Sequence, residues 1–379
     1  MDFEFSEEDK MFRAAIRDFA QKEIAPLVEE AEEKEKFPRH LFPKAGDLGY
    51  LCVRYPEEYG GPGVGKVTEC IYTEELHKVC VGIAGGLMVQ GSLATFPIYQ
   101  MGTEKQKQDY LVPAIKGRKV GAFGLTEPNA GSDITSIETT ARKDGDDYVI
   151  NGVKTFITNG TFSDYVIVAA YTNKEARRKG ISLFLVDKDT PGFTVSKKWP
   201  KMGTRSAEAA ELSFDNVRLP RAKLVGEREG GFESIIGTLQ GGRILFGGRC
   251  VGIAEAVFNM ALPYAKERVQ FGRPIGKFQG ISFKLARMAT EIEVARAMTY
   301  RVAWMYDQGL PCMKEASMIK LFASEMVQRA TWEAMQVLGG TGYMREHPVE
   351  RFFRDARLMT MTEGTSEIQQ VIIAGELGL

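Results

Sequence analysis

The spacing of apolar residues in the first third of the chain is that of amphipathic helices. Close to the N-terminus, apolar side chains recur on one face of a 3.6-residue helix, at Met11, Phe12, Ala15, Ile16 and Phe19. Ser6 and Asp9 have the spacing of a capping box at the start of this helix, and Pro26 should kink or interrupt it. Residues 1–120 are therefore predicted to form an N-terminal helical domain.

The middle of the chain, residues 121–225, has a different pattern. Short runs rich in Val, Ile, Phe, Thr and Tyr alternate with turn-forming pairs such as Asn-Gly, Pro-Gly and Asp-Asn. The pair Asn151-Gly152 is typical of the tight turn of a β-hairpin. Several short strands without helices between them predict an antiparallel β-sandwich or barrel as the middle domain.

Helical spacing returns in residues 226–379. In the segment 280–309 the apolar positions keep the period of a helix, at Leu285, Met288, Ala289, Ile292, Ala295, Met298 and Val302. The segment 312–338 has the same pattern. Long amphipathic helices joined by short breaks predict an antiparallel helical bundle. The expected fold class is thus mainly α with a central β domain.

Composition narrows the classes of function. The chain has 379 residues and a formal net charge of -1, from 49 basic and 50 acidic residues. This balance gives no electrostatic reason to expect nucleic acid or an anionic membrane surface as a partner. No apolar run approaches the ~18 residues that a membrane span requires. The N-terminus lacks the features of a secretion signal or a transit peptide, so we expect a cytoplasmic protein or a mature form from the mitochondrial matrix.

Residue types that ligate metals are few and scattered. No Cys-x-x-Cys pair occurs, so we expect reduced, buried thiols at Cys52, Cys70, Cys80, Cys250 and Cys312. The three histidines are His40, His77 and His347, and no two of them lie within one helical turn. We therefore expect no metal site.

Four motifs stand at the junctions of these regions. "GAFGLTEPNAGSD" opens the β region, "ERVQFGRPIGKFQ" lies between C-terminal helices, "QVLGGTGY" follows the next long helix, and "TEGTSEIQ" comes last. In this order, and on this order of domains, they make the chain resemble the acyl-CoA dehydrogenase family of FAD-dependent flavoproteins. The resemblance extends from "FSEED" to "EIQQVIIAG". It implies removal of an α-proton and a β-hydride from an acyl-CoA to give a 2-enoyl-CoA, as in the β-oxidation of fatty acid metabolism.

The last motif contains an acid that the local structure does not need. In "MTEGTSEIQQ", Ser366 and Gln369 have the spacing of a capping box, so Ser366 is expected to be the N-cap of a final helix. Glu363 lies outside that box. The resemblance implies that Glu363 is the base for the α-proton while the β-hydride leaves to flavin N5. Gly364 then leaves space for the thioester, and Thr362 helps to line the acyl pocket.

Arg243 and Gln240 lie in the segment "GTLQGGRILFGG", near the start of a predicted helix. The resemblance implies that Arg243 supports the active site and that both residues contact the CoA substrate; a surface salt bridge is the alternative for Arg243. Some members of the family carry the base directly before this arginine. Here that place is Gly242, which cannot act as a base, so the resemblance assigns this role to Glu363.

The first motif and the segment "KTFITNG" are implied to hold the flavin ring. Hydroxyl groups and exposed backbone N–H groups in a turn-rich loop can hydrogen-bond the polar edge of a flavin, although a simple turn at the entry to a sheet has the same composition. Ser132 is also implied to contact the CoA arm. The implied FAD contacts here are Phe123, Leu125, Thr126, Gly131, Ser132, Phe156, Ile157 and Thr158. Phe156 stands where the family commonly has tryptophan, so it offers an aromatic face without an indole N–H.

A second group of residues is implied to reach the FAD of a neighbouring subunit. Arginine suits a pyrophosphate because its planar fork offers parallel donors, and glycine lets a backbone approach a cofactor closely. These residues are Arg268, Phe271, Gln279, Gln336, Val337, Gly339 and Gly340, and Thr365 and Glu367 are implied to touch FAD beside the base. The resemblance therefore implies an obligate dimer or a homotetramer built as a dimer of dimers, and an electron-transferring flavoprotein as the electron acceptor.

The acyl group is the part of the substrate that the sequence specifies least. The stretch "MVQGSLATFPIY" is similar to its counterpart in glutaryl-CoA dehydrogenases, which hold a distal carboxylate with an arginine where this chain has Ala84. An unpaired carboxylate in an apolar pocket is costly, so we expect an uncharged linear, branched or alicyclic acyl group. Thr362 and Gly91 are small, which favours a roomy pocket. The alternatives are a glutaryl-CoA-type dehydrogenase and a non-catalytic, flavin-binding assembly protein.

Overall fold

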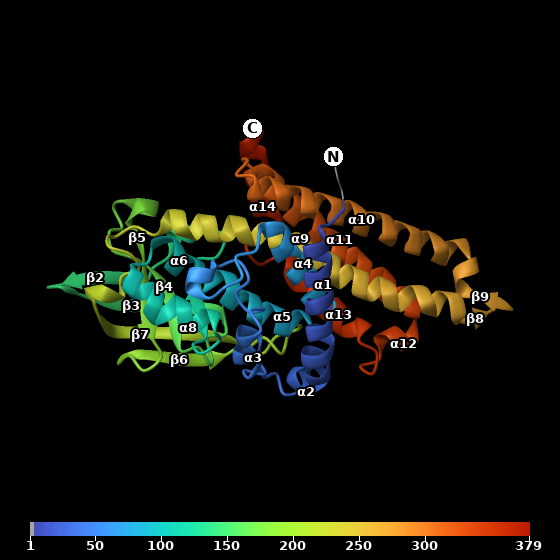
Figure 1. Cartoon of the computed structure of the whole chain (residues 1–379), viewed down its shortest axis with the longest axis horizontal. Helices are drawn as coiled ribbons and strands as arrows, with labels where there is room; N and C mark the ends of the chain where they lie inside the picture. Colours follow the sequence, from blue (N-terminus) through green and yellow to red (C-terminus); the bar gives the residue numbers. More distant parts are fainter. Residues whose placement is uncertain (1–3) are drawn as a thin grey trace.

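The computed structural model describes residues 4–379, and it confirms the predicted order of helices, β-sheet and helices. Figure 1 shows the sheet at one end of an elongated molecule and the C-terminal bundle at the other, with α9 running between them. The N-terminal helices are α1 (Glu7–Phe19), α2 (Val28–Glu33), α3 (Leu41–Asp47), α4 (Lys66–His77), α5 (Val81–Met88), α6 (Phe96–Met101), α7 (Glu104–Gln106) and α8 (Val112–Ile115). The C-terminal elements are α9 (Phe232–Glu267), β8 (Val269–Gln270), β9 (Arg273–Pro274), α10 (Gln279–Asp307), α11 (Met313–Leu338), α12 (Gly340–Tyr343), α13 (Val349–Ala356) and α14 (Ser366–Glu376).

The start of α1 and its end follow the sequence signals. The Ser6 hydroxyl accepts a hydrogen bond from the backbone N–H of Asp9 at 3.0 Å, which confirms the predicted cap. After α1 the chain passes through a π-helical turn, Ala20–Ile24, and a 3-10 turn, Ala25–Leu27, before α2 begins. Pro26 lies in the second turn, where its missing N–H and its ring prevent a continuous α-helix. The predicted interruption at Pro26 is therefore confirmed.

One seven-stranded sheet forms the middle of the chain. Its strands are β1 (Gly121–Gly124), β2 (Thr140–Asp144), β3 (Asp147–Thr158), β4 (Tyr165–Tyr171), β5 (Ile181–Asp187), β6 (Phe193–Lys198) and β7 (Ala209–Pro220). They are ordered β1-β4-β2-β3-β7-β6, with β5 added on β4. The pairings are antiparallel, as expected, except that β4 runs parallel to β1 and meets β2 in parallel at one residue pair. The segment after β1 contacts β3, because the Thr155 N–H donates to the Thr126 carbonyl.

The hairpin predicted at Asn151-Gly152 is wrong. Strand β3 continues through this pair, and its register with β7 shifts between Ile150 and Gly152, which marks a β-bulge. The chain instead reverses between β2 and β3, where Asp144 pairs with Asp147. A Cβ atom at position 152 would lie 2.3 Å from the Thr139 hydroxyl oxygen. Glycine is thus needed there for close packing of two chain segments rather than for a turn.

The sheet is buried on both faces along its central strand. In β4, Tyr165 and Ile167 belong to the large core that also contains the helices, whereas Val166 and Val168 belong to a second core formed by strands of the sheet. This alternation follows from the period of two in a strand. Two helical segments, 81–101 and 232–267, are apolar and long enough for a membrane span. The prediction that no apolar run has this length was therefore wrong. Within the fold 72% and 78% of their most apolar windows are buried, as expected of core helices. All five cysteines are buried and free, as predicted.

Candidate active site

A left-handed turn before α14 holds Glu363. Glu363 has a φ of 53° and Gly364 a φ of 95°, and a positive φ is unusual for a residue with a side chain. The carbonyl oxygen of Gly364 accepts hydrogen bonds from Lys320 Nζ at 2.6 Å and from Gln369 Nε2 at 3.0 Å. Burial lowers the pKa of Lys320 to about 8. These two side chains, from α11 and α14, fix the turn from both sides.

The predicted N-cap of the last helix is wrong by one residue. Thr365 is the N-cap, and its hydroxyl accepts a hydrogen bond from the Ile368 backbone N–H at 3.3 Å. Ser366 is already inside α14, and its hydroxyl has no hydrogen-bond partner among residues 4–379. Gln369, which the predicted capping box required at the helix start, donates to the Gly364 carbonyl instead. The Gln369 side chain therefore holds the turn before α14 and does not form the predicted capping box.

Helix α9 faces the carboxylate of Glu363. A Cβ atom on Gly242 would lie only 1.8 Å from Glu363 Oε2, so the absence of a side chain at this position makes room for the carboxylate. Two turns further along the helix, Arg249 reaches back toward Glu363, with 3.2 Å between its Nη1 and Glu363 Oε1. The two side chains are only 11% and 9% exposed. The sequence analysis missed Arg249, because nothing local marks an arginine that pairs with a residue so far along the chain.

Arg243 and Gln240 also lie on α9. Arg243 is buried, with Nη1 3.4 Å from the sulfur of Met313, so it is not part of a surface salt bridge. Burial lowers the pKa of Arg243, and the nearby charge of Glu363 opposes this effect. Gln240 is half-buried, with Nε2 4.0 Å from the sulfur of Cys312. The structure thus places Arg243 within electrostatic reach of Glu363, and Gln240 one helical turn before Arg243.

The predicted flavin loop is tied to β3 by a buried ion pair. Lys154 Nζ lies 2.7 Å from Glu127 Oε1 and donates to the Leu125 carbonyl at 3.1 Å. Burial lowers the pKa of Lys154 to about 8. Burial alone would raise the pKa of Glu127, but the charge of Lys154 and a backbone N–H donor hold it below its usual value. Neither residue was predicted from the sequence, because the two are 27 positions apart. Their pairing brings the end of β1 to β3, where the Thr155 N–H also donates to the Thr126 carbonyl.

Comparison with known proteins identifies the family of the chain. Family models of the acyl-CoA dehydrogenase N-terminal, middle and C-terminal domains match residues 6–118, 122–217 and 229–378. A probable acyl-CoA dehydrogenase of Bacillus subtilis is 47% identical to this chain over 378 residues, which is 100% of both chains. The chain belongs to the acyl-CoA dehydrogenase family. Like its relatives, the protein is an oxidoreductase, and FAD is the cofactor of the family.

Two solved structures are similar over their full length. Butyryl-CoA dehydrogenase from Megasphaera elsdenii has a TM-score of 0.96 and 42% sequence identity, covering 100% of both chains. An FAD complex of PigA has a TM-score of 0.97 and 29% identity, also covering 100% of both chains. Because both similarities cover the whole chain, they confirm the acyl-CoA dehydrogenase fold for each region described above.

Residues of the sheet fit the flavin of an acyl-CoA dehydrogenase. Phe156 is 61% exposed and has a φ of 60°, although the neighbouring Ile157 is buried. An aromatic ring held outward by an unusual backbone conformation fits a surface that a flat cofactor covers. Its centroid lies 5.4 Å from that of Trp199, whose indole N–H donates to Thr155. The other residues of this set lie in the sheet or in the loop after β1: the buried Phe123 and Leu125, the half-buried Thr126 and Thr158, and the exposed Gly131 and Ser132.

A second set of predicted FAD contacts lies at the opposite end of the molecule. Figure 1 shows the β8–β9 hairpin and α12 at the far end of the bundle from the main sheet. Phe271, in the hairpin, is 93% exposed and has a φ of 50°. The other residues of this set are Arg268, Gln279, Gln336, Gly339 and Gly340, which are exposed, and Val337, which is buried in the core. One chain therefore does not bring the two predicted sets together.

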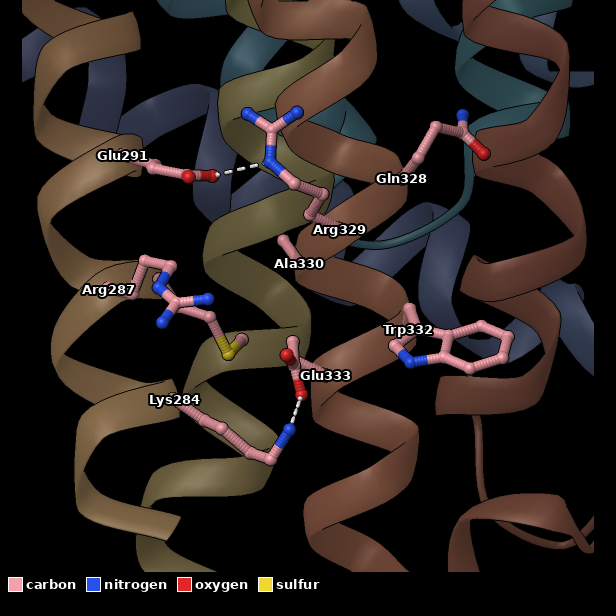
Figure 2. A pocket seen from close by; sticks show the side chains of 9 residues that line it. Lys284, Arg287, Glu291, Gln328, Arg329, Ala330, Trp332 and Glu333 are labelled. Atoms are coloured by element: carbon pink, nitrogen blue, oxygen red, sulfur yellow. Dashed lines mark hydrogen bonds and ion pairs between the residues drawn. The ribbon is translucent and has the colours of Figure 1, made fainter. Parts of the chain in front are cut away.

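A cavity of about 300 Å³ between α10 and α11 lies apart from the acyl-CoA dehydrogenase site. Figure 2 shows two ion pairs among its charged side chains, and Arg287 takes part in neither of them. Lys284 pairs with Glu333, and Arg329 lies 3.1 Å from Glu291. Because four of its five charged side chains are already paired, this cavity offers few groups to a charged ligand.

Proposed function

We propose that Glu363 is the base of an FAD-dependent acyl-CoA dehydrogenase and removes the α-proton of a bound acyl-CoA to give a 2-enoyl-CoA. The position of its carboxylate carries the proposal. The carboxylate is largely buried, is held on a left-handed turn and fills the gap at Gly242. Its Oε2 has no hydrogen-bond partner within residues 4–379. A fixed carboxylate with one free oxygen is suited to accept a proton from a carbon acid.

The residues around Glu363 supply binding and charge. The backbone N–H of Glu363 is available as a donor for the developing enolate oxygen of the thioester. Arg243 adds a buried positive charge on the same side. Gly364 and the half-buried Thr362 border the thioester and the acyl chain. These groups stabilise negative charge where it develops, which is the main requirement for removing a weakly acidic proton.

We infer that the nucleotide end of CoA lies beside the loop that carries Ser132. A cavity of about 810 Å³ next to this loop is lined by Thr135, Ser136, Tyr171, Lys174, Arg177, Arg178 and Lys179, among others. Its basic side chains and hydroxyl groups suit phosphate groups. A CoA molecule bound this way would pass Ser132 and Gln240 on its course toward Glu363.

When bound, FAD accepts the hydride that leaves the β-carbon. Phe156, Thr126 and Ser132 would orient its ring system beside Glu363, with Thr365 and Glu367 at the start of α14. Arg268, Phe271 and Gln279 of another subunit would hold its pyrophosphate and adenosine side. This division supports a homotetramer built as a dimer of dimers. We further infer an electron-transferring flavoprotein as the acceptor and a cytoplasmic location.

The similarity to a butyryl-CoA dehydrogenase supports a short acyl chain. One part of the expectation of a roomy pocket needs correction. A Cβ atom on Gly91 would lie 3.0 Å from the Leu51 carbonyl oxygen, so this glycine allows close backbone packing and does not by itself create space. The expectation of an uncharged acyl group depends on Ala84, which is buried in α5.

Anaerobic reduction of the purified, FAD-loaded protein tests the proposal. Addition of butyryl-CoA should bleach the yellow flavin, and the product should be the 2-enoyl-CoA. Free CoA, which has no α-proton, serves as the control. If no acyl-CoA of any shape bleaches the flavin, the alternative of a non-catalytic flavin-binding assembly protein replaces this proposal.

A further inference from the structure

The ion pair between Arg249 and Glu363 is unusual for a catalytic base. The two side chains meet at 3.2 Å in a largely buried place. Arg249 is only partly used by this contact, because its Nε has no hydrogen-bond partner in the described part of the chain, residues 4–379. Its guanidinium also lies 4.5 Å from the centre of the Phe246 ring. A buried guanidinium with an unused donor is ready to bind a further acceptor.

Two more cations lie beside the preceding residue of α9. A Cβ atom on Gly241 would be 3.9 Å from Arg54 Nη1 and 3.8 Å from Lys66 Nζ. Gly241 is the neighbour of Gly242, whose missing side chain makes room for Glu363. The guanidinium of Arg54 lies 4.3 Å from the centre of the Phe96 ring, in the stretch that is similar to its counterpart in glutaryl-CoA dehydrogenases. Arg54 and Lys66 therefore lie against α9 one residue before the position that makes room for the base.

The charges in this region do not balance. The cations are Arg54, Lys66, Arg243, Arg249 and Lys320, and the buried anions beside them are Glu69 and Glu363. Asp307 also approaches Lys66, but it is exposed and accepts backbone N–H groups.

Neither Glu69 nor His77 removes the imbalance. Glu69 is paired with Lys66, and although its burial favours a raised pKa, the charges of Lys66, Arg54 and Arg249 lower it. His77 is neutral, because burial and the charge of Arg249 lower its pKa to about 3. The two buried carboxylates of this group, Glu69 and Glu363, thus face five cations.

We propose that Arg249, supported by Arg54, binds a carboxylate at the end of the acyl group distant from the thioester. The substrate would then be a short diacid esterified to CoA at one end. This proposal rests on the dehydrogenase function proposed above and revises the expectation of an uncharged acyl group. The site is formed by α9 and the segment before α4, and it does not use position 84, where Ala84 stands.

The reaction itself gives a reason for such a site. When Glu363 accepts the α-proton, its charge disappears and Arg249 loses its partner. A buried guanidinium without an anion is costly. A carboxylate of the substrate that pairs with Arg249 would free Glu363 for the α-proton and keep the guanidinium paired afterwards.

The distances restrict the length of the acyl group. The base must lie about 3 Å from the path of the α-proton. Arg249 lies one ion-pair distance, 3.2 Å, beyond the base carboxylate. The distal carboxylate must therefore be within reach of the α-carbon through a few carbon atoms, as in a succinyl or glutaryl group.

Matched pairs of substrates test this inference on the FAD-loaded protein. Glutaryl-CoA and pentanoyl-CoA have acyl chains of equal length and differ in the distal carboxylate, as do succinyl-CoA and butyryl-CoA. For at least one pair, anaerobic flavin reduction should have a kcat/KM at least ~10-fold higher with the diacid, as expected for one charge-assisted hydrogen bond. Titration of the FAD-loaded Glu363→Gln variant gives binding without turnover, and the diacid should again bind at least ~10-fold more tightly.

Variants at Arg249 provide the second comparison. Arg249→Met should lower the ratio of diacid to neutral kcat/KM by about 10- to 100-fold, whereas Arg249→Lys should keep part of it. Arg218→Met, on the surface of the sheet, is the matched control and should leave the ratio unchanged. A wild-type preference for the neutral thioester in both pairs, with no change of ratio in Arg249→Met, would overturn the anion site and leave the dehydrogenase intact. A complete lack of flavin reduction by every thioester would instead overturn the proposed function and this inference together.

Discussion

The two ends of the proposed cofactor site differ in how many of their contacts a single chain supplies. Around Glu363 the partners come from the same chain: Lys320, Gln369 and Arg249 hold or pair the turn and its carboxylate. At the far end of the bundle, Phe271 and Tyr343 are exposed aromatic residues. The part proposed to perform proton transfer is therefore organised within one chain, whereas the part proposed to hold the distal half of FAD is exposed.

This difference shows which part of the proposed site requires precise positioning of its groups. A base must be placed to within a fraction of an ångström, and only a tightly packed surrounding can do so. The contacts of a pyrophosphate and an adenosine can come from a second subunit, because they contribute binding and not chemistry. We therefore expect substitutions near Glu363 to change turnover, and substitutions near Phe271 to change cofactor affinity.

The largest effect is expected from Glu363→Gln. This variant keeps the shape of the side chain but lacks a base, so turnover should fall by ~10²-fold or more while FAD remains bound. Stopped-flow flavin reduction and the ratio of FAD to protein measure the two quantities. Near-normal turnover would remove Glu363 from the mechanism, and loss of FAD would show that the turn serves the cofactor as well.

Gly242→Ala should have the next largest effect. The added methyl group would lie 1.8 Å from Glu363 Oε2 and must displace the carboxylate. A displacement of about 1 Å can lower turnover by about 10²-fold, so we expect a loss of about 10- to 100-fold. The matched control is Gly241→Ala, whose nearest atoms are at ordinary contact distances of 3.8 and 3.9 Å. Equal losses in both variants would indicate a general effect on α9 and would contradict the steric explanation.

Arg268→Ala should weaken FAD binding without disabling the base. Loss of a charge-assisted contact to a pyrophosphate should raise the dissociation constant of FAD by about 10- to 100-fold. Turnover at saturating FAD should stay close to that of the wild type. Arg301→Ala, on the exposed side of α10, is the control for a change of charge. Unchanged FAD affinity in Arg268→Ala would mean that this end of the molecule does not hold the cofactor.

The smallest effect concerns the cap of α14. Thr365→Ala removes the hydroxyl that accepts the Ile368 N–H and should lower stability by about 1 kcal/mol. Ser366→Ala should cost much less, because the Ser366 hydroxyl has no partner among the described residues. Thermal unfolding of the two variants, measured with FAD bound, compares them directly. A larger loss of stability in Ser366→Ala than in Thr365→Ala would support Ser366 as the N-cap, as predicted from the sequence.

Much of the fold could be predicted because its signals are local. The apolar period identified α10 and α11 to within a few residues, and the Ser6 cap and the break at Pro26 each depend on neighbouring residues. The hairpin at Asn151-Gly152 failed for the opposite reason. Pairing with β7 and close packing against Thr139 decide the conformation there, and both partners are distant in sequence.

The candidate site shows the same limit. Glu363 could be assigned from a motif, since its neighbours in sequence carry the resemblance. Arg249, Lys320 and the Glu127–Lys154 pair could not, because each acts on a residue of another element. No local pattern distinguishes a buried arginine that meets the base from an arginine that covers a helix.

The gap at Gly242 has a consequence for how this site can vary. A side chain at position 242 and the carboxylate of Glu363 would occupy the same volume, although the two positions are far apart in sequence. The two positions are therefore mutually exclusive places for one acidic group. Among related chains, an acid at one of them should be accompanied by a small residue at the other, and this covariation can be sought by counting pairs. A chain with acids at both positions would have to move α9 away from the turn.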